Sequence, residues 1–190
     1  AYRAGVFPWF NSDQEAVLWW SPDPRTVIDP QQIKISRSLA KRLRSPRYSV
    51  TIDTRFKEVM GACAAPRRGS EGTWITERMR QAYRALHELG YAHSVEVWEN
   101  QNLVGGLYGV SLGGLFFGES MFSRQADASK VALVRLSELL RTQGIELIDC
   151  QVASAHLYSL GAFDLPRTDF LKRLQELLER PDRRGMWDFQ

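Results

Sequence analysis

The sequence is poor in the residues that bind metals or form disulfides. It contains two cysteines, Cys63 and Cys150, which are far apart and belong to no Cys-x-x-Cys motif. Its three histidines show no ligand spacing with either cysteine. We therefore expect neither a metal site nor a disulfide framework in this chain.

Long apolar segments are also missing. No run approaches the roughly 18 to 20 residues of a membrane-spanning helix, and the N-terminal AYRAGVFPWF is not a basic-then-apolar export signal. The chain of 190 residues is 44% hydrophobic, which is enough to bury a core, and it shows no long heptad seam. These features predict a monomeric cytoplasmic protein that does not associate with membranes.

Acidic residues are absent from residues 30–52, where six basic residues occur. A helix predicted over residues 36–45 gathers several of these cations into a basic stripe. We consider Lys41, Arg42 and Arg44 candidates for contacts with a nucleic-acid backbone. An ordinary solvated helix face is the alternative interpretation.

The remaining chain alternates between helical and strand periodicity. The strand that follows the second helix is expected to run parallel to the third strand, because a long crossover separates them. The last helix is expected to begin at Thr168 as its N-cap. In chain order, the predicted elements are a helix at 76–89, strands at 94–98, 103–111 and 115–122, a helix at 127–142, a strand at 145–152 and a helix at 168–180.

This order predicts an α+β fold of the N-acetyltransferase (GNAT) type, with a mixed, mainly antiparallel sheet flanked by helices. We expect a small N-terminal domain at residues 1–62, preceded by a segment before Ala1, and an acyltransferase-like domain at residues 63–190. Such a fold separates two central strands to admit an acyl donor. However, SRQADASK follows Phe122 where a coenzyme A enzyme would have a glycine-rich turn, which favours a different nucleotide donor.

Glu119 lies within the apolar stretch GLFFGESMF. Burial of an unpaired polar group costs about 2–7 kcal/mol, and burial of a charge costs more. The carboxylate therefore requires compensation. A buried ion pair, a solvent-facing edge position and a ligand that donates hydrogen bonds in an apolar pocket are the alternatives.

Several long motifs resemble those of one bacterial family. They are YRAGVFPWF, LWWSPDPR, GTWIT, LHELGYAHSVEVW, LVGGLYGV, FFGESMFSR, DASK and IDCQV followed by HLYSLGA. In this order they resemble the leucyl/phenylalanyl-tRNA–protein transferases. The resemblance implies transfer of leucine or phenylalanine, less readily methionine, from aminoacyl-tRNA to proteins that begin with arginine or lysine. That addition marks the acceptor for N-end-rule degradation.

The resemblance also implies roles for individual residues. Gln151 would relay a proton from the attacking amine, and Asp149 would polarise Gln151. The two side chains can meet because residues two apart on a strand share a face. Trp74 and Trp20 would stack on the terminal adenosine. An aminoacyl ester is already activated, so the reaction needs no cofactor.

The strand around Glu119 supplies candidates for substrate contacts. Glu119 would meet either the adenine amino group or the aminoacyl α-amine, and Ser120 would form a hydrogen-bonding wall. Four apolar residues are candidates for the pocket that takes the leucyl or phenylalanyl side chain, with ordinary core packing as the alternative: Leu107, Phe116, Met121 and Ile148.

Two other functions remain open at this stage. An acetyl-coenzyme A-dependent N-acetyltransferase is disfavoured by the missing glycine-rich loop. A non-catalytic tRNA-binding module is disfavoured by the presence of Glu119, Asp149 and Gln151. The sequence does not rank leucine against phenylalanine as the donor.

Overall fold

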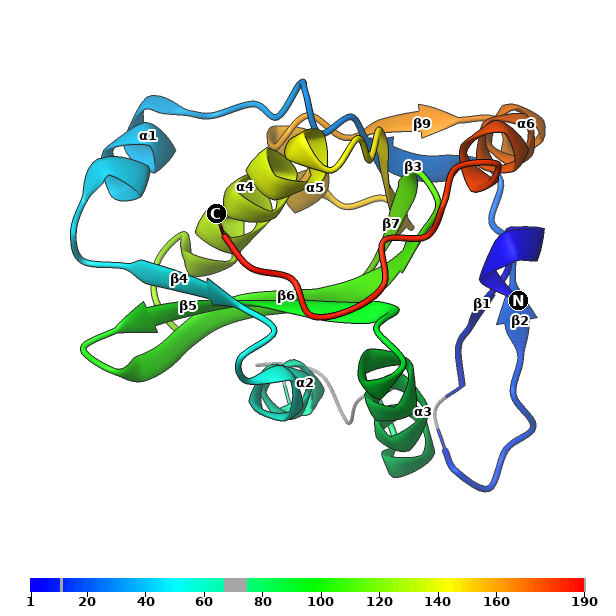
Figure 1. Ribbon diagram of the computed structural model, residues 1–190, viewed down its shortest axis with the longest axis horizontal. Coiled ribbons are helices and arrows are strands. Elements are labelled where there is room, and N and C mark those ends of the chain that lie inside the picture. Colours follow the sequence, from blue (N-terminus) through cyan, green and yellow to red (C-terminus); the bar gives the residue numbers. More distant parts are fainter. Residues whose placement is uncertain (11, 67–74, 190) are drawn as a thin grey trace.

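The computed structural model describes residues 1–10, 12–66 and 75–189. Its centre is one seven-stranded sheet with the order β4-β5-β6-β7-β8-β3-β9 (Figure 1). Neighbouring strands are antiparallel except β7 and β8, which are parallel as expected. The predicted α+β class is therefore confirmed. The strands are β3 (Arg25–Ile28), β4 (Ser49–Ile52), β5 (Ala92–Glu99), β6 (Asn102–Leu112), β7 (Leu115–Ser123), β8 (Leu147–Gln151) and β9 (Phe163–Leu165).

Helices cover both faces of this sheet. The basic helix α1 (Arg37–Arg44) and the long helix α4 (Ala128–Thr142) lie over one face, and α2 (Phe56–Ala64) and α3 (Glu77–Glu88) lie over the other (Figure 1). The alternation of strand side chains gives each face its own apolar core. Two further helices, α5 (Ala155–Ser159) and α6 (Arg167–Leu178), follow β8. No helix among the described residues is long and apolar enough to cross a membrane.

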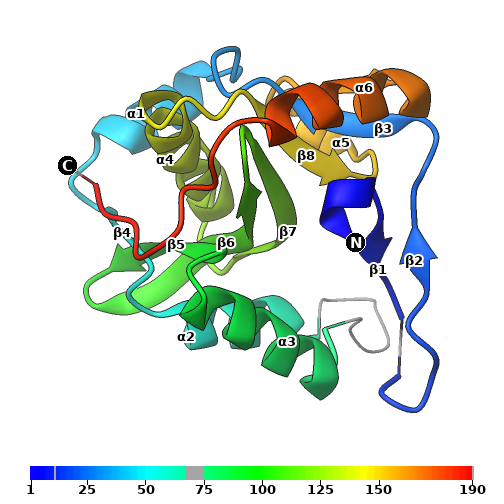
Figure 2. The same ribbon diagram turned by 45° about the vertical axis from the view of Figure 1, so that its right-hand side comes forward.

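The N-terminal residues reach the same sheet. A short 3₁₀ helix, η1 (Tyr2–Ala4), and a two-stranded ribbon of β1 (Phe7–Pro8) and β2 (Trp19–Trp20) lie beside β8 and β3 (Figure 2). Strand β3 then pairs with β8 and β9, and β4 pairs with β5. The first 62 residues thus contribute two strands to the central sheet, and the domain boundary at residue 62 stays a prediction.

The predicted start of the last helix is wrong. Helix α6 begins at Arg167 after Pro166, and no side chain at Pro166 caps it. The Arg167 N–H instead donates to the Asp23 carboxylate, 3.0 Å away and more than a hundred residues earlier in the chain. The Asp23 carboxylate, which is distant in sequence, therefore accepts a hydrogen bond from the first turn of α6, as was expected of the Thr168 side chain. By contrast, Thr76 caps α3 as predicted.

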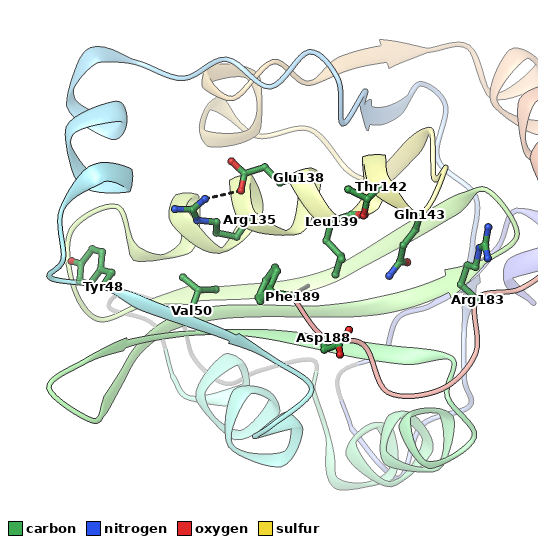
Figure 3. Close-up of a pocket in the computed structure, with 10 residues that line it drawn as sticks. All are labelled: Tyr48, Val50, Arg135, Glu138, Leu139, Thr142, Gln143, Arg183, Asp188 and Phe189. Carbon is green, nitrogen blue, oxygen red and sulfur yellow. Dashed lines mark hydrogen bonds and ion pairs between the residues drawn. The ribbon is translucent and has the colours of Figure 1, made fainter.

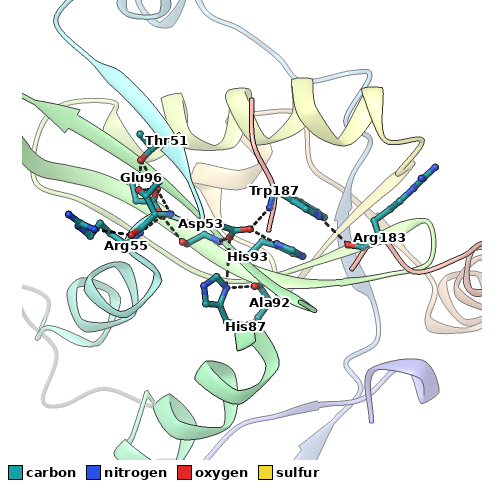
Figure 4. Close-up of polar contacts among 11 residues, drawn as sticks. Thr51, Asp53, Arg55, His87, Ala92, His93, Glu96, Arg183 and Trp187 are labelled. Atoms are coloured by element: carbon teal, nitrogen blue, oxygen red, sulfur yellow. Dashed lines mark hydrogen bonds and ion pairs between the residues drawn. The ribbon is translucent and has the colours of Figure 1, made fainter. Parts of the chain in front are cut away.

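The C-terminal segment crosses the sheet and is held by a buried carboxylate (Figure 4). Asp53 accepts hydrogen bonds from the backbone N–H groups of Ser94 and Trp187, both at 2.9 Å, and lies 2.8 Å from His93 Nδ1. The Trp187 indole stacks on the His93 ring at 3.6 Å. These contacts fix the segment beside a groove of about 720 Å³ between α4 and β4, which Phe189 also lines (Figure 3).

Candidate active site

The parallel strands β7 and β8 separate after a short pairing. They pair from Leu115 to Phe117 on β7, and β7 then continues to Ser123 paired with β6 but no longer with β8. A cleft of about 1250 Å³ opens where they diverge. Residues of β1 and α2 line it on one face of the sheet, and residues of α4 and α5 line it on the other. The separation of the strands therefore makes a cleft that is lined by residues from both faces of the sheet.

Glu119 lies at a β-bulge in this cleft. Tyr108 pairs with Ser120 and Gly109 pairs with Gly118, so Glu119 is an extra residue without a cross-strand partner. The bulge directs its carboxylate toward α3 and the N-terminus. There it accepts hydrogen bonds from the hydroxyls of Tyr2 and Tyr83, each at 2.6 Å.

The two tyrosines explain how the Glu119 carboxylate is tolerated in an apolar stretch. It is compensated by neutral hydroxyl donors, and it forms no ion pair with any residue that the structure describes. Burial raises the pKa of Glu119 to about 7, and hydrogen bonds from the tyrosines limit that rise. Burial and the nearby Glu119 hold the pKa of Tyr2 well above its ordinary value, so its hydroxyl keeps its proton and donates.

Asp149, on β8, has a different environment from Glu119. It forms a bidentate ion pair with Arg25, with N···O distances of 2.8 and 2.6 Å, and both side chains are completely buried. Its Oδ1 also accepts the backbone N–H of Gln151 at 2.9 Å. Asp149 therefore carries a compensated charge and fixes the end of β8.

Gln151 connects the two carboxylates. Its backbone has a φ of 64°, a left-handed conformation that interrupts the alternation of side chains along β8. Its backbone is held by Asp149, while its side-chain Nε2 lies 3.5 Å from Glu119 Oε1. The sequence analysis expects the Gln151 side chain to act with that of Asp149. In the structure, the Gln151 side chain contacts Glu119 instead. The proton relay between Asp149 and Gln151 stays a prediction.

The candidate apolar pocket is assembled as a continuous surface. Leu133 and Leu136 of α4 extend it, and most of its residues are buried. Ser120 also lines the cleft. All four residues predicted for the donor side chain line the cleft: Leu107, Phe116, Met121 and Ile148.

The structure describes one of the two predicted stacking residues, Trp20. Trp74 lies outside the described residues. Trp20 is half exposed on β2 opposite Phe7, and its indole N–H donates to the Trp9 carbonyl at 3.2 Å. Trp9, which the sequence analysis did not select, lines the cleft itself. Its place in the motif YRAGVFPWF was the available signal.

The basic stripe lies on α1, away from the residues that line the cleft. Leu39 is buried against the α4 side of the sheet, which holds α1 in place. Lys41 and Arg44 are exposed and Arg42 is half-buried. This exposure suits contacts with a large anionic partner and equally suits a solvated helix face.

Three residues of the site were missed from the sequence: Tyr2, Arg25 and Tyr83. Tyr2 and Arg25 belong to motifs that the family resemblance already contains, YRAGVFPWF and LWWSPDPR. Tyr83 lies on the apolar face of a predicted helix and is therefore interpreted as core from periodicity alone. Their partners are between 36 and 124 residues away in the chain.

The raised pKa of Glu119 predicts how stability depends on pH. Its ordinary value is 4.5 and its value in the fold is about 7, so between these values the folded state keeps a proton that the unfolded chain has lost. The free energy of unfolding should fall as pH rises through this window, by about 1.4 kcal/mol per unit of pKa difference. Urea unfolding of the wild type and of Glu119→Gln at pH 5 and pH 7.5 measures this. A difference between the two proteins that stays constant with pH would contradict the assignment.

Comparisons with known proteins identify the family of the chain. The family described as "Leucyl/phenylalanyl-tRNA protein transferase" matches residues 27–175, and its N-terminal domain matches residues 1–23. A leucyl/phenylalanyl-tRNA–protein transferase of Nitrosospira multiformis is 57% identical over 189 residues, which cover 100% of this chain and 81% of the relative. One of Thiobacillus denitrificans is 56% identical, with coverage of 100% and 82%.

Solved structures give only a distant likeness. L-PGS from Bacillus licheniformis is 10% identical with a TM-score of 0.44, covering 79% of this chain and 48% of that one. A GCN5-related N-acetyltransferase from Kribbella flavida is 9% identical with a TM-score of 0.43, covering 77% and 55%. The sequence matches alone establish the family. The chain belongs to the leucyl/phenylalanyl-tRNA–protein transferases.

Proposed function

We propose that this protein transfers leucine or phenylalanine, less readily methionine, from aminoacyl-tRNA to the N-terminal α-amine of proteins that begin with arginine or lysine, marking them for N-end-rule degradation. The observation that carries the proposal is the buried Glu119 and Gln151 pair beside an apolar pocket, at the point where β7 and β8 separate. Family membership supports the same donor chemistry.

The cleft suits an aminoacyl ester. A leucyl or phenylalanyl side chain fits the apolar surface built around Leu107 and Phe116, and Met121 is flexible enough to adapt to both shapes. Trp9 offers aromatic surface at the opposite face for the terminal adenosine, with Trp20 and Trp74 as further stacking candidates. The ester would then lie between them, near Gln151.

The transfer itself needs one new bond and one proton transfer. The amine nitrogen attacks the ester carbonyl, a C–N bond forms, and the bond from the carbonyl carbon to the ribose oxygen breaks. One amine proton must leave and the ribose oxygen must gain one. Gln151 orients the amine through its amide oxygen, and the Glu119 carboxylate takes up the proton and returns it to the ribose oxygen.

Asp149 acts indirectly in this scheme. Its charge is compensated by Arg25, and its contact to the Gln151 backbone holds the glutamine in its left-handed conformation. Much of the catalysis then comes from placing the amine and the activated ester together, which contributes on the order of 7 kcal/mol or more.

One assay tests the function and separates it from its alternatives. The protein is incubated with labelled leucyl-tRNA and a peptide that begins with arginine, and again with labelled acetyl-coenzyme A. We expect labelled peptide only with the tRNA donor. Label from acetyl-coenzyme A would indicate an N-acetyltransferase, and tRNA binding without transfer would indicate a non-catalytic module.

In the same assay, Gln151→Ala should lower the transfer rate constant much more than it lowers tRNA affinity. The reason is that its amide contacts the amine only when the reaction proceeds. Single-turnover rates and tRNA binding are measured side by side, with Glu138→Gln, at an ion pair of α4 outside the cleft, as a control. Unchanged turnover in Gln151→Ala would remove the glutamine from the mechanism.

The basic stripe should affect the affinity for tRNA and not the rate of the transfer step. Changing Lys41, Arg42 and Arg44 together to alanine should weaken binding of leucine and phenylalanine tRNAs alike and flatten the salt dependence, because fewer phosphates are neutralised. An aminoacyl-adenosine donor has no acceptor stem and should react at the wild-type rate. Equal loss with this minimal donor would mean that the stripe supports the fold instead.

A further inference from the structure

The α4 side of the cleft ends in a polar rim. Asp127 and Lys130, at the start of α4, form an ion pair with an N···O distance of 3.0 Å, and their side chains are 24% and 30% exposed. His156 of α5 lies at the same rim. Burial and the neighbouring Lys130 lower the pKa of His156, so its imidazole is neutral at pH 7 and the local charges are those of Asp127 and Lys130.

Asp127 is the carboxylate in this cleft that a cation can reach. Among the cleft residues that the structure describes, two carry carboxylates, Glu119 and Asp127. Glu119 already accepts hydrogen bonds from Tyr2 and Tyr83 and is assigned above to the proton transfer, which leaves Asp127 for the cationic side chain. Asp127 is partly exposed, and although it precedes α4 its side chain forms no cap hydrogen bond.

The cations near Asp127 would allow an external cation to take the place of Lys130. Lys130 is held by one partly exposed ion pair, a type of contact worth about 1 kcal/mol or less. Arg124, which also lines the cleft, is occupied elsewhere: its guanidinium lies over the Phe122 ring and donates to the Leu103 carbonyl. A cationic ligand could therefore replace Lys130 at Asp127 at little cost.

We propose that Asp127 binds the cationic side chain of the acceptor protein's first residue and so selects arginine and lysine. This inference rests on the proposed function, in which the adenosine of the donor occupies the face of Trp9. The acceptor then enters from the opposite face, between α4 and α5. Lys130 neutralises Asp127 before the acceptor binds. The cationic side chain of the acceptor then displaces Lys130 from Asp127.

The test compares Asp127→Asn with the wild type on three peptides, which begin with arginine, lysine or citrulline, the neutral analogue of arginine. Asparagine tolerates the left-handed φ of 63° at this position, so the fold should be kept. A matched control is Glu138→Gln, which removes the carboxylate of another i,i+3 ion pair of α4, with Arg135, outside this cleft (Figure 3). The donor is leucyl-tRNA at varied concentration.

Asp127→Asn should raise the KM for the arginine and lysine peptides on the order of tenfold and bring it close to that of the citrulline peptide. The donor KM should not change, and Glu138→Gln should behave as the wild type. Lys130→Met, which removes the competing cation, should lower the KM for the two basic peptides.

Three results would overturn the inference in distinguishable ways. An unchanged preference for arginine over citrulline in Asp127→Asn would place the specificity elsewhere. A raised donor KM with an unchanged acceptor KM would mean that Asp127 meets the α-amine of the donor. Absence of transfer from leucyl-tRNA to any peptide by the wild type would overturn the proposed function together with this inference.

Discussion

The buried ion pair of Arg25 and Asp149 is the constraint on which the site depends. Arg25 pairs with Asp149 on β8, donates to the Gly5 carbonyl after η1 and lies between the rings of Phe7 and Phe170. It therefore joins the N-terminal segment, α6 and the sheet at one point. Removing one partner of such a pair leaves a buried, uncompensated charge and typically costs about 3–5 kcal/mol. Loss of the pair would release both the Tyr2 segment and the end of β8.

The same pair separates the roles of two carboxylates in the site. Asp149 accepts hydrogen bonds from the Arg25 guanidinium and from the Gln151 backbone N–H, and these contacts hold it in place at the end of β8. Glu119 accepts hydrogen bonds from the neutral hydroxyls of Tyr2 and Tyr83, its Oε1 lies 3.5 Å from the Gln151 amide nitrogen, and burial raises its pKa to about 7. Carboxylates with opposite environments commonly divide into structural and proton-transferring roles.

The sequence predicted those parts of the molecule that depend on local periodicity. Helices α1, α3 and α4, the meander and the parallel strand β8 follow from spacing, and the four apolar residues chosen around Glu119 all line the cleft. The parts that were missed depend on distant contacts. Tyr2 and Glu119 are 117 residues apart and Arg25 and Asp149 are 124 apart, and no local pattern connects them. The positive φ of Gln151 interrupts the strand pattern, so strand alternation did not predict the contact with Glu119.

Desolvation in the cleft acts on both groups of the proposed proton transfer. Burial raises the pKa of Glu119 from 4.5 to about 7. An α-amine that enters the same environment loses hydration of its charged form, so its pKa falls below the ordinary range of about 7.7–8.0. The two values therefore approach one another, and a proton can pass between amine and carboxylate with little free-energy difference near neutral pH. A fully solvated glutamate would be too weak a base for this step. The two tyrosines and the bulge at Glu119 thus tune the base and the nucleophile together.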